Sequence, residues 1–326
     1  MKNIFIYASE LAVITGDNVF QELSDIILKY YANHFPLQYT LILSRLEEQN
    51  YVITQKEEKE ETVERVLKKN NNEFIETIKE CLKSEKKENL GKEQKELLNK
   101  LENMKEDEKK NINVLETIKK CFDNEKVENL QKNQKIICDK LMKNDNVKLD
   151  DKKEFKEALI SMTNTNFGTK QENSALVEYE NKNNKNIITT TDFFKKPLLN
   201  TENINWYLGG KVDGIDLESR TVIEIKNRVR CLFYKLRNYE KVQCYAYMYL
   251  LDMRKTHLIE RLKSDNSQMN VIEFDFENDY FQDHILYKIN KFTRLFEKIL
   301  NDDNLLVFLL TEDKKNIKKF LKNEMF

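Results

Sequence analysis

An internal repeat is the feature that most limits how this 326-residue chain can fold. Residues 75–101 align without gaps to residues 115–141, and more than half of the aligned positions are identical. Each copy has a helical pattern, a polar break, which in the first copy is near Glu88 and Asn89, and a second helical pattern. Two copies are too few for a solenoid that folds by itself. The repeats therefore predict helical hairpins inserted into a larger fold.

Composition and pattern change on both sides of the repeats and divide the chain into three parts. Residues 1–53 are expected to be an N-terminal helical part of the main domain, with a helical pattern over residues 4–46 and Ser9 as the N-cap of the first helix. Residues 54–153 are rich in Lys, Glu and Asn and form the predicted helical insertion. Residues 154–326 are expected to hold the core and the C-terminal helices.

Helical and strand patterns alternate after residue 153. Their order predicts an α+β fold in which a central mixed β-sheet is flanked by helices. The chain has only six Gly and two Pro, too few for a loop-rich sandwich or a propeller. The predicted helices are residues 155–162, 170–180, 236–253 and 282–301, and the predicted strands are residues 187–194, 206–216, 219–228 and 270–276.

The charges of the chain nearly cancel, with 55 Lys and Arg against 56 Asp and Glu. This balance excludes a uniformly polycationic protein but not a nucleic-acid enzyme, because a neutral sum can conceal a basic cleft. The five cysteines show no CxxC spacing, and no apolar run approaches the ~18 residues of a membrane span. We therefore expect a soluble intracellular protein with neither a disulfide framework nor a zinc site.

Two short segments carry the clearest chemical signal. Alternate residues of a strand share a face, so Glu224 and Lys226 point to one side while Ile225 points to the other. Asp213 directly precedes Gly214, where a hairpin would bring it beside Glu224. Two adjacent carboxylates repel each other unless a divalent cation lies between them, and oxygen ligands suit Mg²⁺ or Mn²⁺. The pattern predicts a metal site, although taken alone it is also typical of an exposed pair on an edge strand.

Two polar residues on apolar helix faces strengthen this prediction. Glu172 shares a helical face with Ala175 and Tyr179, and a carboxylate in that position needs a partner or a metal. Gln243 likewise shares a face with Tyr247, which directs its amide inward. Each residue alone is compatible with an ordinary core polar group. Together with the two carboxylates and the lysine of the strands, they form a constellation.

Five motifs then occur in one order along the chain: Ala8-Ser9-Glu10, Phe167-Gly168 with Glu172-Asn173 and Ala175, Val212-Asp213-Gly214, Glu224-Ile225-Lys226, and Val242-Gln243. This order resembles the PD-(D/E)xK nucleases, and within them the lambda-type exonucleases, also called YqaJ-like viral recombinases. The resemblance covers residues 1 to about 25 and 154 to about 300. It implies a restriction-endonuclease-like core, and the Lys- and Asn-rich insertion looks like versions carried by large DNA viruses.

The resemblance implies a role for each residue of the constellation. Asp213, Glu224 and the carbonyl of Ile225 would ligate the catalytic metal, and Glu172 would complete the acidic set around a second ion or its waters. Lys226 would orient and help to deprotonate the attacking water. Gln243 would hold Lys226 or that water in place. The implied cofactor is Mg²⁺, for which Mn²⁺ can substitute, with two ions per site.

Four further residues are predicted to bind DNA phosphate. Relatives commonly carry an Arg shortly before the first motif to bind a 5′ phosphate, and this chain has only a Lys there. Ser9 is retained, and Lys211, two residues before Asp213, could supply the missing charge. Arg228 and Arg230, which come shortly after Lys226, are the other two predicted phosphate ligands.

The implied function is metal-dependent exonucleolytic hydrolysis of duplex DNA, 5′ to 3′, in viral DNA recombination, repair or replication. The implied partners are double-stranded DNA with free ends, a single-strand annealing protein and further copies of the chain, with no membrane, in the host cytoplasm or nucleus. One alternative is an endonuclease or structure-specific nuclease with the same ligands. The other is a helical interaction protein on an inactive nuclease scaffold, although such a scaffold has no physical reason to keep a self-repelling acidic cluster.

Overall fold

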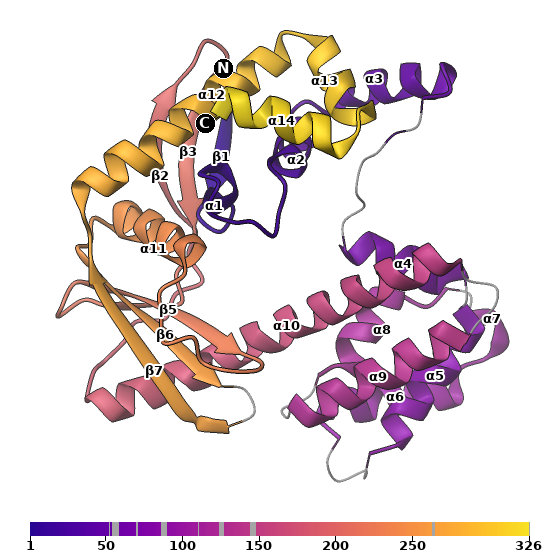
Figure 1. The fold of residues 1–326 in the computed structure, drawn as a ribbon. Helices are drawn as coiled ribbons and strands as arrows, with labels where there is room; N and C mark the ends of the chain where they lie inside the picture. Colours follow the sequence, from indigo (N-terminus) through magenta and orange to yellow (C-terminus); the bar gives the residue numbers. More distant parts are fainter. Residues whose placement is uncertain are drawn as a thin grey trace.

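The computed structural model describes residues 1–51, 53, 59–69, 71–85, 90–109, 111–123, 127–143, 148–262 and 265–325. Figure 1 shows two lobes that are joined by one long helix. We call the part built from residues 1–51 and 184–325 the main lobe, and the part built from residues 59–167 the insertion lobe. The predicted α+β class, with mixed sheets flanked by helices, is confirmed. Within the described residues, no helix is both long and apolar enough to span a membrane.

Three strands form the first sheet of the main lobe, in the order β1-β3-β2. Strand β1 (Lys2–Tyr7) pairs in parallel with β3 (Ile204–Gly210), and β2 (Phe194–Asn200) pairs antiparallel with β3. The helical prediction for residues 4–46 is therefore wrong at its start. Ile4 and Ile6 are fully buried on one face of β1, which is the alternation of a strand and not the period of a helix.

Four strands form the second sheet, in the order β4-β5-β6-β7. They are β4 (Gly214–Asp216), β5 (Thr221–Arg228), β6 (Lys255–Leu262) and β7 (Asp265–Asp275). Strand β5 pairs antiparallel with β4 and parallel with β6. The single central sheet of the prediction is thus two sheets, because the strand predicted over residues 206–216 is interrupted at residues 211–213. Strand β6 was not predicted, and residues 187–194 contribute an isolated bridge at Ile188 before β2 begins.

Helices pack on both sheets and enclose the main core. On α12, Ile289, Phe292, Phe296 and Ile299 recur at helical spacing and are fully buried. The rings of Phe292 and Phe296 meet the ring of Trp206 on β3 edge to face, with ring centroids 5.9 and 5.5 Å away. The helices of this lobe are α1 (Leu11–Ile14), α2 (Leu23–His34), α3 (Pro36–Glu48), α11 (Asn238–Leu251), η2 (Tyr280–Leu286), α12 (Tyr287–Leu300), α13 (Asp303–Thr311) and α14 (Lys314–Met325).

The repeats form helices, as predicted, and these build a second core. The first copy contains α5 (Asn71–Lys83) and α6 (Lys92–Asn103), and the second contains α8 (Val114–Cys121) and α9 (Val127–Lys143). The predicted break at Glu88 and Asn89 lies outside the described residues. Equivalent positions of the two copies, such as Ile78 and Ile118 or Cys81 and Cys121, are fully buried in this core. The lobe also contains α4 (Lys59–Lys69) and α7 (Glu106–Lys109).

Helix α10 (Leu149–Asn183) joins the two lobes and corrects the prediction of two helices separated by a loop. Residues 163–168 continue the helix, and the hydroxyls of Thr163 and Thr165 donate hydrogen bonds within it, to the carbonyls of Leu159 and Ser161. Its first half packs in the core of the insertion lobe. Its second half packs on β5 and β6 in a third apolar cluster. One rigid helix therefore ties the insertion to the sheet that carries the predicted site.

Separate cores predict separate unfolding of the two lobes. Phe296→Ala empties a fully buried site in the main core, so it should lower the stability of that lobe by about 3–5 kcal/mol. Ile118→Ala should lower only the stability of the insertion lobe, by about 2–5 kcal/mol. Differential scanning calorimetry should resolve two transitions that shift one at a time. A single transition that both substitutions shift together would contradict the description of two cores.

Candidate active site

The hairpin of β4 and β5 brings Asp213 beside the Glu224 segment. Gly214 lies opposite Ile223 in the antiparallel ladder, which ends there. Just beyond the ladder, Oδ2 of Asp213 accepts a hydrogen bond from the backbone N–H of Ile225, at 2.7 Å. The N–H and C=O of one strand residue leave on the same side, so the Ile225 carbonyl also faces the edge where Asp213 lies. The structure thus brings together the residues that the sequence predicted at this turn.

Glycine is required where the hairpin meets α10. A Cβ atom at Gly214 would lie 2.6 Å from a methyl carbon of Ile187, closer than real Cβ atoms come to a neighbour, and in tight contact with one of Leu176 at 3.0 Å. The absence of a side chain therefore lets the turn approach α10 closely. This close approach brings Glu172, on the same helix, toward the hairpin.

Glu224 lies at the centre of the site. It is 3% exposed, and its Oε1 atom accepts a hydrogen bond from Lys226 Nζ at 2.6 Å. Its Oε2 atom is buried and has no hydrogen-bond partner among the described residues. Burial, followed by repulsion from Asp213, raises the pKa of Glu224 to about 8. A buried oxygen without a partner costs free energy, so this atom marks a place for a ligand.

The pKa values of the two neighbouring carboxyl groups, of Asp213 and Glu172, are also raised. Burial and then repulsion from Glu172 raise the pKa of Asp213 to about 6. Burial and then repulsion from Glu224 raise the pKa of Glu172 above its ordinary value. Glu172 lies on α10 and, as the helical pattern indicated, shares a face with the buried side chains of Ala175 and Tyr179. Three carboxyl groups therefore repel one another across the interface between α10 and the hairpin.

A chain of polar contacts holds Lys226 from the side of α11. Lys226 Nζ donates to Oε1 of Gln243 at 3.1 Å, and Nε2 of Gln243 donates to the hydroxyl of Tyr247 at 3.0 Å. Burial alone would lower the pKa of Lys226, but attraction and hydrogen bonding from Glu224 raise it overall. The amine is therefore fixed in its charged form between a carboxylate and an amide.

The donor atoms of this site fit a hard divalent cation. Among the residues that the structure describes, no three His, Cys, Asp or Glu side chains lie close enough to hold a metal between them. The buried carboxylate of Glu224, the half-buried carboxylate of Asp213 and one backbone carbonyl are at the same edge. Mg²⁺ commonly takes one or two carboxylates and keeps several waters, which matches this set. Zinc, which favours nitrogen and sulfur donors, does not.

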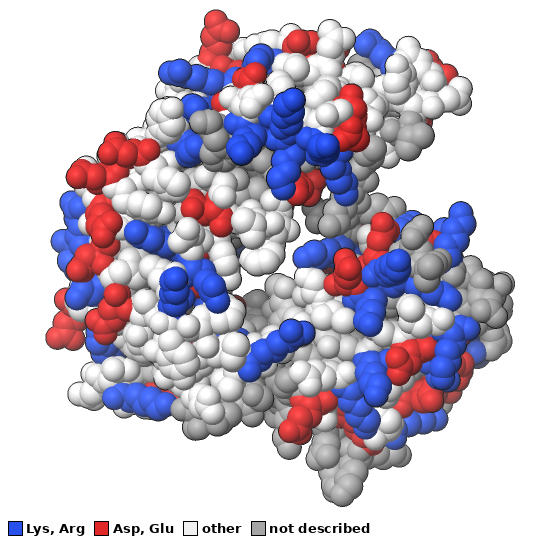
Figure 2. Space-filling view, in the orientation of Figure 1, with Lys and Arg blue, Asp and Glu red and all other residues white. Residues whose placement is uncertain are grey.

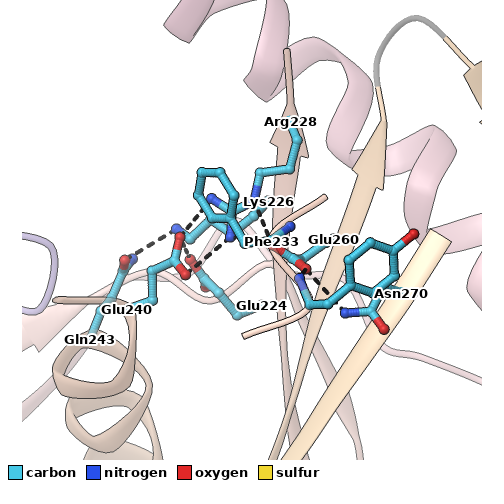
Figure 3. A network of polar contacts seen from close by, with 9 residues as sticks. Glu224, Lys226, Arg228, Phe233, Glu240, Gln243, Glu260 and Asn270 are labelled. Carbon is cyan, nitrogen blue, oxygen red and sulfur yellow. Dashed lines mark hydrogen bonds and ion pairs between the residues drawn. The ribbon is translucent and has the colours of Figure 1, made fainter. Parts of the chain in front are cut away.

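A second polar network, shown in Figure 3, continues from Lys226 along β5. The guanidinium of Arg228 binds Glu240 through both of its terminal nitrogens, at 2.7 and 3.0 Å, and reaches Glu260 at 2.7 Å. The side chains of Glu240 and Glu260 are 1% and 0% exposed. Arg228 therefore neutralises two buried carboxylates within the fold, and its binding to DNA phosphate stays a prediction. Sequence reasoning did not identify Glu240 or Glu260, although Glu240 lies one helical turn before Gln243.

The other predicted phosphate ligands are exposed. Ser9 is not the N-cap of the first helix, because Glu10 has that position. The side chain of Glu10 accepts hydrogen bonds from Lys29 and Tyr30. Parallel pairing sets Tyr7 opposite Gly209, so the two chains leave their strands side by side and carry Ser9 and Lys211 to the same edge. Arg230 lies beyond β5 and is also exposed. The structure thus groups Ser9 with Lys211, and Arg230 lies beyond the C-terminal end of β5.

Comparison with known proteins gives a weak likeness. No family profile and no curated protein sequence matches the chain. Similar solved structures include SSO0001, at 16% identity over 50% of this chain and 84% of that chain, with a TM-score of 0.33. They also include LHK-Exo, an alkaline exonuclease from Laribacter hongkongensis. It is 12% identical over 56% of this chain and 88% of that chain, with a TM-score of 0.34. The structure of LHK-Exo in complex with dAMP is 12% identical over 55% of this chain and 87% of that chain, with a TM-score of 0.33. Identities and TM-scores this low do not assign a function. A function has to be inferred from the residues of this chain.

The raised pKa values predict how stability without metal depends on pH. The folded protein binds more protons than the unfolded chain between the ordinary carboxyl pKa and the raised values near 6 and 8, so stability falls as pH rises through that window. In EDTA, the melting temperature should fall between pH 5.5 and 8.5. Glu224→Gln should remove most of that fall, and added Mg²⁺ should reverse it.

The matched control is Glu218→Gln, which changes an exposed carboxylate on the same β4–β5 hairpin. This variant should melt like the unmodified protein at every pH. If Glu224→Gln and the unmodified protein showed the same pH dependence in EDTA, the carboxyl group of Glu224 would not be under the electrostatic stress described above.

Proposed function

We propose that the chain is a divalent-metal-dependent deoxyribonuclease that hydrolyses phosphodiester bonds. The observation that carries this proposal is the unpartnered, buried oxygen of Glu224 beside Asp213. A pair of carboxylates that is destabilised unless a cation binds has a clear use in metal-assisted hydrolysis. The ordered motifs of the sequence and the support of Lys226 by Gln243 favour the same chemistry.

Each side chain then has a separate task. Asp213, Glu224 and the Ile225 carbonyl hold the cation, with Glu172 beside a second ion or its water ligands. When bound, Mg²⁺ or Mn²⁺ supplies a nucleophilic water at neutral pH and neutralises charge on the phosphate. The charged amine of Lys226 orients that water and stabilises the developing negative charge. Gln243 keeps the amine in place, since its amide is itself held by Tyr247.

The finer proposal is an exonuclease that acts on duplex DNA ends. Ser9 and Lys211 form an exposed pair at one edge of the first sheet, where a 5′ phosphate could be bound by a hydroxyl and an ammonium group. This pair supports the 5′ to 3′ direction that the sequence resemblance implies. The resemblance also favours a role in viral DNA recombination, repair or replication, with a single-strand annealing partner and a homo-oligomeric assembly.

Removing the central ligand tests the proposed chemistry. Glu224→Gln keeps the shape of the side chain but removes its charge, so hydrolysis of end-labelled linear DNA with Mg²⁺ should fall by at least about a thousandfold, several kcal/mol of lost stabilisation. Glu218→Gln, on the same hairpin, should retain full activity. An unchanged rate in purified Glu224→Gln would reject the site. Cleavage of supercoiled circles would instead identify an endonuclease that uses the same ligands.

The proposed phosphate pair makes a prediction about DNA ends. A charge-assisted contact contributes roughly 1.5–3 kcal/mol, so a 5′-phosphorylated duplex should be degraded about 10- to 150-fold faster than a 5′-hydroxyl duplex. Lys211→Ala should remove most of that preference, and Ser9→Ala should reduce it less. Lys319→Ala, an exposed lysine of α14, is the control and should change nothing. Equal rates on both ends with the unmodified protein would exclude a 5′-phosphate pocket.

A further inference from the structure

The loop between β5 and α11, residues 229–237, connects the two elements that hold Lys226 and Gln243. We call it the β5–α11 loop. Arg230, Lys235 and Arg237 are exposed on it, and it has no Asp or Glu. Acidic and basic residues are balanced over the whole chain, so a loop with only positive charges is a local concentration of charge. This concentration would attract a polyanion.

The backbone of the loop is fixed by one buried carboxylate. Glu260 lies on β6 directly opposite Lys226 and is 0% exposed. It accepts hydrogen bonds from the backbone N–H groups of Phe233 and Tyr234, at 3.2 and 2.9 Å, and from Asn270 at 3.0 Å. These contacts, seen from close by in Figure 3, hold the tip of the loop against β6, the strand next to that of Lys226. The backbone of the loop therefore has a defined position.

Stacked cations fix the next part of the loop. The guanidinium of Arg228 lies 4.2 Å from the ring centroid of Phe233, and that of Arg237 lies 4.4 Å from it. Contacts of this kind are favourable because the ring face is negative. Both arginines thus hold the ring of Phe233 in place.

Tyr234, the residue after Phe233, is unusual in two respects. Its φ angle is +53°, in the left-handed region that non-glycine residues rarely adopt. Its side chain is 69% exposed, although large aromatic side chains are usually covered. The fold therefore holds a tyrosine in a strained conformation that presents its ring to solvent. Strain of this kind is typical of sites where the side chain has a use.

We propose that the β5–α11 loop binds an unpaired DNA strand, with the ring of Tyr234 stacked on a base and Arg230, Lys235 and Arg237 against the flanking phosphates. An exposed ring among cations is the combination that binds single strands, because every base offers a face for stacking. Arg228, whose guanidinium lies against the ring of Phe233, is two residues after Lys226 on β5, a rise of about 7 Å, so the loop lies near the proposed site of hydrolysis. This assignment of a strand-binding site rests on the proposed nuclease function.

Binding measured in EDTA separates the loop from the chemistry. Fluorescence anisotropy would compare a duplex that carries a single-stranded overhang with the same duplex closed at both ends by hairpin loops of a non-nucleotide linker. Tyr234→Ala should weaken binding of the overhang duplex by about 5- to 150-fold and leave the closed duplex unchanged. Tyr234→Phe, which keeps the ring, should bind within about twofold of the unmodified protein. Tyr287→Ala, at an exposed tyrosine of α12, should bind both DNAs normally.

Tyr234→Gly distinguishes a binding role from a structural one. Glycine accepts the positive φ angle, so this variant should melt at a higher temperature than the unmodified protein and still lose affinity for the overhang. Unchanged affinity in Tyr234→Ala, or equal losses in Tyr234→Ala and Tyr234→Phe, would overturn the proposal. Normal hydrolysis with unchanged affinity in Tyr234→Ala would reject the loop assignment alone. Lost affinity in a protein that never hydrolyses DNA would uphold strand binding and reject the nuclease.

Discussion

Repulsion between the buried carboxylate of Glu224 and the half-buried carboxylate of Asp213, at the β4–β5 hairpin, is the constraint around which the site is organised. Asp213 and Glu224 are forced together by the antiparallel ladder and by the hydrogen bond from Ile225. Only one positive side chain, that of Lys226, forms an ion pair with Glu224 among the described contacts. The protein thus keeps an arrangement that costs stability without a bound cation. Such a cost is expected at a functional site and not in a core selected only for packing.

In the polar network next to this pair, in contrast to the pair itself, each charged group has a partner. Arg228 neutralises Glu240 and Glu260, and Glu260 also holds the backbone of the β5–α11 loop. Buried networks of this kind are rigid when every member has a partner. The fixed network places β5, β6 and α11 at constant distances, and α10 closes the site from the insertion side. Figure 2 shows that Lys and Arg side chains lie on both rims of the hollow between the two lobes, where a DNA strand could be accommodated.

The sequence predicted the local patterns well and the long-range pairings poorly. Alternation identified β5 with Glu224 and Lys226 on one face, and helical spacing placed Glu172 and Gln243 on inward faces. Strand β1 was predicted as helix although its alternating Ile and aromatic residues favour a strand; its partner β3 lies about 200 residues away, and such a pairing leaves no local pattern in the sequence. The true partners of Arg228 were missed for the same reason. A basic residue after a catalytic motif has no sequence signal that separates phosphate binding from an internal ion pair.

Anomalous diffraction from crystals grown with Mn²⁺ is the most direct test of the central claim, that the strained carboxylate pair is a cation site. The account predicts a peak about 2.1 Å from oxygens of both Asp213 and Glu224, with water completing the coordination. Crystals of Glu224→Gln should lack the peak. An ordered Mn²⁺ elsewhere in the molecule, with the unpartnered oxygen of Glu224 still free of any ligand, would contradict the account.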